Sequence, residues 1–408
     1  MPAPTSASPS ADPGPTAARV AAVLAGPLSA SALGPAGHVH AMVLDAPTGV
    51  VLLNYGGNAL ITPASVTKLL TARAALATLG PDTRLATRIV ASAPVTADGT
   101  VAGDLWLVGG GDPTLTDDPN ADPRTASIAR LVTAIQAAGV KRVTGRVLGD
   151  GSLFTGSPTG PGWTPDYVTG GSVAPVTALE LDGGRFAPSD EPAPRVAHVE
   201  SYAAEKLAAA LSAAGISVAG GPSAPGVAPA GASTVAAVDG LPVSALVARM
   251  LTYSDNDLAE SLGRLVALHD GQTATFAGEA AALVASSGDD GPDLKLHDAS
   301  GLSRLDRLPL QALVDVLATA PHELLAGLSI AGRTGTLADR FHTPATQRAI
   351  GRVRGKTGAL NGINTLAGVA TDRRGDRLVF AFATDAVTSR ADAELALDTC
   401  AAALTALP

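Results

Sequence analysis

The sequence predicts a mixed α/β (α+β) fold, in which one antiparallel sheet is flanked by helices and interrupted by a β-rich insert. Three observations lead to this prediction. A β-hairpin pattern lies near the N-terminus, strand patterns followed by a helix close the chain, and residues 81–235 between them have a different texture. At 408 residues the chain is also long for one hydrophobic core, so two or more domains are expected.

The N-terminal part holds four expected elements. Residues 1–16 are rich in Pro, Ala and Ser, a composition typical of a flexible tether. In the hairpin, Pro47-Thr48-Gly49 supplies the turn, and Gly80-Pro81 ends the helix that follows. The tether, a first helix, the hairpin and a second helix are expected at residues 1–16, 19–33, 38–53 and 65–79.

Residues 81–235 are expected to form one or more inserted β-rich domains. Their short apolar runs are separated by Gly, Pro and Asp turns, which is typical of short strands. Strands are predicted at residues 88–91, 104–108 and 142–149, and helices at 125–138 and 202–214. The Pro-, Gly- and Ala-rich stretch 220–232 is predicted to be the linker that closes the insert.

The patterns of residues 236–408 again indicate helices and longer strands. Helices are predicted at residues 241–251, 257–268 and 391–407, and strands at 351–358, 365–370 and 378–384. The turn sequence 372–376 joins the last two strands as a hairpin. We therefore expect residues 17–80 and 236–408 to form one domain around a shared sheet.

Ser65 and Lys68 form the first of three short motifs. They stand three residues apart at the start of a predicted helix, so their side chains lie on one face. A serine hydroxyl needs a base within hydrogen-bond reach to act as a nucleophile, and an ammonium cannot be that base. Burial and a second cation, for which Lys356 is the candidate, would lower the pKa of Lys68. Ser-x-x-Lys by itself is a weak signal.

Ser254-Asp255-Asn256 is the second motif, and it lies between two predicted helices, where a loop can project side chains into a cleft. Ser254 could relay a proton to a leaving amine, while Asn256 offers an amide to a substrate carbonyl. Taken alone, Ser254 or Asp255 would more commonly cap the helix that begins near Asp257.

Lys356-Thr357-Gly358 is the third motif, at the end of a predicted strand, where the glycine permits close approach of another backbone. Lys356 supplies positive potential and Thr357 a hydroxyl for a terminal carboxylate. A peptide can lie along the strand edge, with the Ala359 amide as an oxyanion donor. Alone this motif could be an ordinary strand end. The three motifs in this order favour acyl transfer from a peptide with a free carboxylate.

The composition excludes several classes of partner. A net charge of −9 gives no reason to expect nucleic acid, which requires a basic stripe. No apolar run approaches the roughly 20 residues of a membrane span. The sequence shows no convincing set of metal ligands, so no metal or cofactor is expected. Pro27 interrupts the apolar stretch near the N-terminus, and any native signal peptide is expected to have been removed.

With these motifs, the chain resembles the class C low-molecular-mass penicillin-binding proteins, of the D-alanyl-D-alanine carboxypeptidase/endopeptidase family. Penicillin-binding proteins carry the same trio. Five further stretches are similar to that family's sequences, at residues 63–69, 109–115, 149–154, 298–303 and 335–341. One departure is Ala359, where many relatives carry threonine, so one hydrogen bond to the substrate is in doubt.

The resemblance implies the penicillin-binding-protein/β-lactamase-like transpeptidase fold with extra domains inserted between the first two motifs. It implies a serine D-alanyl-D-alanine carboxypeptidase, or DD-endopeptidase, that acts outside the cytoplasm on peptidoglycan stem peptides. β-Lactam antibiotics would acylate the nucleophile as substrate mimics. The implied site comprises catalytic Ser65, Lys68 and Ser254, and substrate-binding Asn256, Lys356, Thr357, Gly358 and Ala359.

Two other functions remain open at this point. A β-lactamase or serine esterase could use the same fold, but it would need a base that removes the acyl group. The candidate Glu180 lies within the insert, so hydrolysis of penicillin is expected to be slow. A non-catalytic cell-wall scaffold is the third reading, and the presence of all three motifs argues against it.

Overall fold

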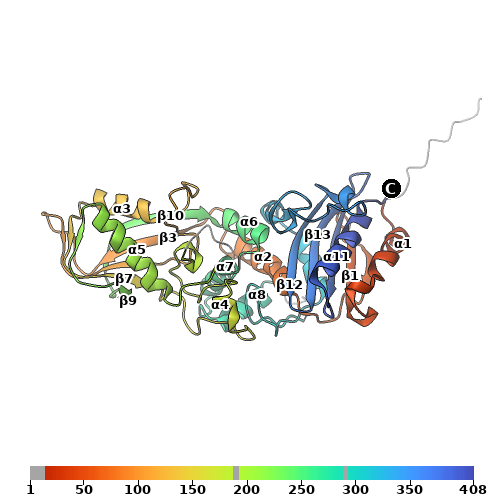
Figure 1. Ribbon diagram of the computed structural model, residues 1–408, viewed down its shortest axis with the longest axis horizontal. Helices are drawn as coiled ribbons and strands as arrows, with labels where there is room; N and C mark the ends of the chain where they lie inside the picture. The colour runs from red at the N-terminus through yellow and green to blue at the C-terminus, as the bar shows by residue number, and fades with distance from the viewer. Residues whose placement is uncertain (1–13, 187–192, 288–292) are drawn as a thin grey trace, which may run out of the picture.

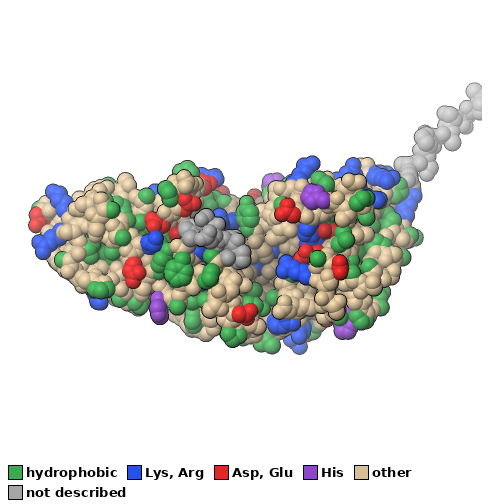
Figure 2. Space-filling model, in the orientation of Figure 1, with side chains coloured by type: hydrophobic (Ala, Val, Ile, Leu, Met, Phe, Trp, Pro, Cys, Tyr) green, Lys and Arg blue, Asp and Glu red, His purple; other side chains and the backbone are tan. Residues whose placement is uncertain are grey.

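The chain is seen in a computed structural model that describes residues 14–186, 193–287 and 293–408. The molecule is elongated, with the insert at one end and a sheet covered by helices at the other (Figure 1). Four helices, α2 Lys68–Thr78, α6 Val243–Tyr253, α7 Asn256–His269 and α8 Phe276–Ala285, lie between the two sheet systems. Acidic and basic side chains are interspersed on the face drawn in Figure 2, whose outline is notched between the two halves.

A six-stranded antiparallel sheet organises the main domain, in the order β11-β12-β13-β14-β1-β2. Its strands are β1 Val39–Asp45, β2 Val51–Tyr55, β11 Ser329–Ile330, β12 Val353–Leu360, β13 Ile363–Thr371 and β14 Arg377–Thr384. Because β1 pairs with β14 over seven residues, the two ends of the chain share one sheet, as the sequence predicts. The mixed fold with an antiparallel sheet is thus confirmed.

Both faces of this sheet are covered. Along β14 the side chains of Leu378, Phe380 and Phe382 join one buried cluster, and the alternate residues Val379 and Ala381 join another. This follows from the two-residue period of a strand. One cluster includes α1 Ala17–Leu28 and α11 Arg390–Leu404. Helices of the other are α2 Lys68–Thr78, α6 Val243–Tyr253, α7 Asn256–His269, α8 Phe276–Ala285, α9 Leu310–Ala318 and α10 His322–Gly327.

The insert contains a five-stranded sheet in the order β10-β3-β5-β7-β9 and a three-stranded sheet in the order β4-β6-β8. The first comprises β3 Arg84–Ala91, β5 Leu105–Val108, β7 Val147–Asp150, β9 Ala224–Pro225 and β10 Ser233–Pro242. The second comprises β4 Thr100–Val101, β6 Arg142–Val143 and β8 Ser217–Val218. Helices α3 Ile128–Ala137 and α5 Val199–Ala213 pack on a separate buried core, and α4 Asp166–Thr169 is a single turn.

Two strand assignments within the insert differ from the sequence-based ones. The single strand predicted at 142–149 is two strands, β6 and β7, which belong to different sheets. Gly145 lies between them, and its amide donates a hydrogen bond to the Gly103 carbonyl oxygen at 2.8 Å. The stretch 220–232, predicted to be a linker, contains β9, which pairs with β7.

The division of the chain into domains stays a proposal. The expected boundary at 235/236 falls inside β10, which pairs with β3 as far as Pro242. We therefore propose that the insert spans residues 81–242 and the main domain residues 17–80 and 243–408. Residues 1–13 of the expected tether lie outside the described residues.

Candidate active site

Ser65 lies on a turn of 3-10 helix, Ala64–Thr67, that leads directly into α2. The sequence predicts a helix from Ser65, so the first turn is tighter than expected. Ala64 has a positive φ of 54°, and its carbonyl accepts a hydrogen bond from Thr67 Oγ1 at 2.9 Å. Gly301 packs against the same carbonyl, which would lie 2.0 Å from a Cβ at that position. This turn is therefore held by neighbours on two sides.

Lys68 is fully buried and its ammonium nitrogen has three partners. Nζ lies 3.1 Å from Ser65 Oγ, 2.6 Å from Asn256 Oδ1 and 2.7 Å from the Ser300 carbonyl oxygen. The expected nucleophile, its expected base and the asparagine of the second motif thus meet at one nitrogen, although 188 positions separate Lys68 from Asn256.

Ser254 ends α6 in the left-handed conformation, at φ 60° and ψ 35°. That turn directs its hydroxyl oxygen to Lys356 Nζ at 2.8 Å. Asp255 caps α7 by accepting a hydrogen bond from the Leu258 amide at 3.0 Å. Asn256 donates from Nδ2 to the Ser172 carbonyl of the insert at 2.8 Å. The capping role considered for this motif is present at Asp255, while Ser254 contacts Lys356 and Asn256 contacts Lys68.

Lys356, Thr357, Gly358 and Ala359 lie on β12, beyond the two residues, Arg354 and Gly355, that pair with β11. The edge of β12 from Lys356 onward therefore has no partner strand among the described residues. Lys356 is fully buried, and Thr357 donates from Oγ1 to Thr336 Oγ1 at 2.9 Å.

Gly358 packs against the turn that carries Ser65. A Cβ there would lie 2.2 Å from Thr365 Oγ1 and 3.0 Å from the Ser65 amide nitrogen. Only glycine allows the strand and the turn to come this close, which places the Ser65 and Ala359 backbones on neighbouring segments.

The two buried lysines both have lowered pKa values. Burial lowers the pKa of Lys68 to about 8, and nearby carboxylates, of which Asp298 and Glu260 contribute most, oppose that effect. Burial and the charge of Lys68 together lower the pKa of Lys356 well below its usual value. A fraction of Lys68 is therefore neutral near pH 8 and able to accept a proton.

Three contacts of the site were not assigned from the sequence. Ser300 and Ser172 contribute backbone carbonyls, which carry no side-chain signature. Thr336 contributes a hydroxyl to Thr357 from the 3-10 turn Gly335–Leu337. Ser300 and Thr336 fall within two of the stretches that are similar to the family's sequences. That similarity is the sequence feature from which these two contacts could have been predicted.

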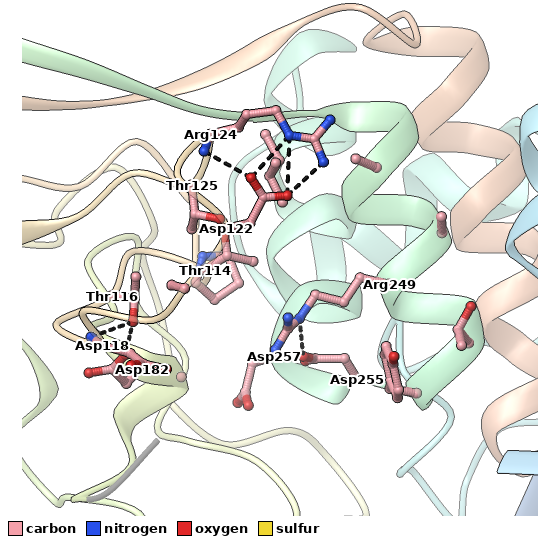
Figure 3. Close-up of a pocket in the computed structure, with 18 of the residues that line it drawn as sticks. Thr114, Thr116, Asp118, Asp122, Arg124, Thr125, Asp182, Arg249, Asp255 and Asp257 are labelled. Carbon is pink, nitrogen blue, oxygen red and sulfur yellow. Dashed lines mark hydrogen bonds and ion pairs between the residues drawn. The ribbon is translucent and has the colours of Figure 1, made fainter. Parts of the chain in front are cut away.

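A pocket of about 490 Å³ lies behind the second motif, between α6 and loops of the insert (Figure 3). Asp255 and Arg249 line it, with their charged groups 3.8 Å apart. Ser65, Lys68 and Lys356 do not line this pocket, so it is separate from the cluster around Ser65.

Neither a membrane span nor a metal site is found among residues 14–186, 193–287 and 293–408. No helix there is long and apolar enough to cross a bilayer. No cluster of His, Cys, Asp and Glu side chains in the same part of the chain has the arrangement of a metal site.

Comparison with known proteins identifies extended similarity. The sequence profile described as the D-Ala-D-Ala carboxypeptidase 3 (S13) family matches residues 24–195 and 190–407. The chain is 37% identical over 384 residues to carboxypeptidase DacB of Mycolicibacterium smegmatis, and this alignment covers 90% of the chain and 80% of that protein. It is 36% identical over 361 residues to a carboxypeptidase of Mycobacterium tuberculosis, covering 85% and 76%.

The crystal structure of penicillin binding protein 4 (dacB) from Haemophilus influenzae has the same fold. It superposes with a TM-score of 0.74 at 22% identity, over 93% of this chain and 98% of that one. The fold predicted from the resemblance is confirmed by this match.

Proposed function

The chain belongs to the D-Ala-D-Ala carboxypeptidase 3 (S13) family and is a serine-type carboxypeptidase, and we propose that it acts on peptidoglycan stem peptides through an acyl-enzyme on Ser65. The observation that carries this assignment is the convergence of Ser65, Asn256 and the Ser300 carbonyl on the buried Lys68 nitrogen. Nucleophile, base and an orienting group within hydrogen-bond reach are what activated-serine chemistry requires.

In the proposed acylation step, neutral Lys68 takes the proton of Ser65 while Oγ attacks the carbonyl carbon between the two D-Ala residues. The resulting oxyanion would be bound by the amides of Ser65 and Ala359, because Gly358 brings those segments together. Asn256 uses one amide hydrogen on Ser172, and its second is available for the carbonyl of the substrate.

The leaving amine must gain a proton as the carbon–nitrogen bond breaks. Ser254 is placed for this because its oxygen accepts from Lys356, which leaves its own hydroxyl hydrogen free to be donated. Lys356 can then return a proton to Ser254. Water then attacks the ester on Ser65: its proton passes through Ser254 to the now neutral Lys356, while Lys68 returns its proton to Ser65 Oγ. This releases the shortened stem peptide and restores the hydroxyl and both lysines.

Lys356 and Thr357 are proposed to bind the terminal carboxylate. Among the described residues, the buried Lys356 nitrogen has only the Ser254 hydroxyl and the Thr357 carbonyl oxygen as hydrogen-bond partners. An incoming carboxylate would favour its protonated form, because an opposite charge nearby raises the pKa of a lysine. Substrate binding would thereby supply the proton that the leaving group later needs.

The direct test is intact mass after treatment with penicillin. We expect one penicilloyl group on the unmodified protein and none on Ser65→Ala. The absence of an adduct on the unmodified protein would instead favour a non-catalytic wall scaffold. A Haemophilus influenzae relative has been seen in complex with a β-lactam.

A β-lactamase is disfavoured by the state of Glu180. This residue is buried, and burial together with Asp257 and Asp255 raises its pKa well above the usual value. Its surroundings therefore favour the protonated form, which makes Glu180 a poor base for activating water. Rapid hydrolysis of nitrocefin over many turnovers would show instead that the protein acts as a β-lactamase.

The rate of acylation is expected to rise with pH. The free base form of Lys68 is the reactive one, and its pKa is about 8, so the second-order rate constant should increase through about pH 8 and then level. Stopped-flow measurements of acylation by a fluorescent penicillin between pH 6 and 10 would follow this rise in the rate constant. A rate independent of pH across that range would remove Lys68 as the base.

Replacing Thr357 by valine should weaken substrates with a free terminal carboxylate more than amidated analogues, by about tenfold for the loss of one hydrogen bond to a charged group. Valine keeps the shape of threonine but cannot contact the carboxylate or Thr336. Comparing kcat/KM for the two peptides is the measurement. Equal losses on both would remove Thr357 from carboxylate recognition.

The substrate places the protein outside the cytoplasm, so we propose an extracytoplasmic location at the cell wall. Whether cross-linked or monomeric stem peptides are preferred is tested with defined muropeptides of both kinds. Faster release from the monomer would indicate a carboxypeptidase, and faster release from the cross-linked dimer an endopeptidase.

A further inference from the structure

Asp298 accepts three hydrogen bonds directly behind the nucleophile. Its Oδ1 accepts from the Gly301 amide at 2.7 Å, and its Oδ2 accepts from the Ser303 amide at 2.6 Å. The third donor is Trp163 Nε1 of the insert, 2.7 Å from Oδ2. Asp298 is fully buried, so all of its contacts are within the protein.

These bonds shape the segment that faces Lys68. The Ser300 carbonyl accepts from Lys68 Nζ, and Gly301 adopts a φ of +79° against the Ala64 carbonyl. Ser300 is held from its other side by Glu260, whose Oε1 accepts the Ser300 amide at 2.9 Å. Asp298 and Glu260 thus fix the position of the acceptor for Lys68.

Other charged groups surround this carboxylate. Burial and the neighbouring Asp298 raise the pKa of Asp306 to about 10, so Asp306 is protonated at neutral pH. Glu279, from α8, is buried with Arg264 at 2.6 Å, and its pKa is raised well above the usual value. Toward Lys68 itself, the remaining charges are those of Asp255, Asp257 and Lys356.

We propose that Asp298 is a positioning residue that links the insert to the general base: it binds Trp163 on one side and, on the other, orients the Ser300 carbonyl that holds Lys68. It touches neither substrate nor Ser65, and it acts through Lys68. This inference rests on the proposed role of Lys68 in acylation. On this proposal, Trp163 of the insert helps to position Lys68.

The test compares acylation by a fluorescent penicillin in four single variants. Asp298→Asn keeps the shape and removes the charge, so the acid limb of the pH–rate profile should move to lower pH, because Asp298 is the largest of the charges that raise the pKa of Lys68. The rate on the plateau should fall about 10- to 100-fold from misplacement of the base. Trp163→Phe keeps a ring and loses one donor, so a three- to tenfold slower rate, on the order of one hydrogen bond, is expected.

Matched controls are available within the insert. Asp150 is also buried and accepts two backbone amides, from Ser152 and Ala228, so Asp150→Asn removes a similar group far along the chain. Trp106 is buried in the insert, and Trp106→Phe is the control for Trp163→Phe. Both controls should keep the rate and the pH profile of the unmodified protein.

The outcomes separate this inference from the proposed function. If the unmodified protein forms no penicilloyl adduct, the proposed function has failed. Two results would overturn only the role of Asp298, provided that the unmodified protein reacts normally. Asp298→Asn could give the same pH profile as the unmodified protein, or Asp150→Asn could shift that profile as much as Asp298→Asn does. Should Asp298→Asn not fold, the pair Trp163→Phe and Trp106→Phe decides, and equal rates for the two would refute the link.

Discussion

Replacing Lys68 by alanine is expected to lower the second-order rate constant for acylation by penicillin by at least about 10³-fold. The variant would lose the base, since no other described nitrogen forms a hydrogen bond with Ser65 Oγ. Circular dichroism should show an unchanged fold, because the hydrogen bonds that Lys68 makes are to groups of the site. Rates of adduct formation from intact mass provide the measurement.

Lys141→Ala is the matched control for this variant. Lys141 is an exposed lysine of the insert, and its replacement should leave acylation unchanged. A Lys68→Ala protein that acylates at nearly the normal rate would show that another group removes the proton from Ser65.

Gly358→Ala is expected to reduce the rate of acylation by about 10²- to 10³-fold. The added methyl group would lie 2.2 Å from Thr365 Oγ1, which holds the Pro63 carbonyl at 2.9 Å, and 3.0 Å from the Ser65 amide nitrogen. Either the strand or the turn must move, and removing one oxyanion donor alone costs about 10²- to 10³-fold. The acylation rate and the melting temperature should be measured together.

Gly37→Ala serves as its control, because a Cβ at Gly37 meets nothing within 4 Å. It should match the unmodified protein in both readouts. If Gly358→Ala acylates normally, the close approach of β12 to the nucleophile turn is not needed for catalysis.

Much of the main domain could be predicted because its elements carry strong local patterns. The strands at 365–370 and 378–384 and the helix at 391–407 correspond to β13, β14 and α11, with ends shifted by a few residues. Their apolar periods and turn residues are properties of the local sequence. In the insert, short strands with two or four residues carry weaker patterns, which is why β6 and β7 were merged and β9 was missed.

Asp255 shows where a local interpretation stops being sufficient. Its capping of α7 is visible in the sequence, because a cap acts over three residues. The contact of Ser254 with Lys356 spans 102 positions, and nothing near either residue specifies it. The left-handed turn at Ser254 that aims the hydroxyl becomes visible only in the folded chain.

The sequence alone determined which chemical groups are present: a serine with a lysine three residues later, a short polar loop and a Lys-Thr-Gly strand, in the order typical of one family of enzymes. Only the tertiary structure decided which groups surround Lys68 and how far its pKa falls, because burial and carboxylates from distant segments set that value. It also supplied the backbone carbonyls of Ser300 and Ser172, which bind through atoms that every residue carries.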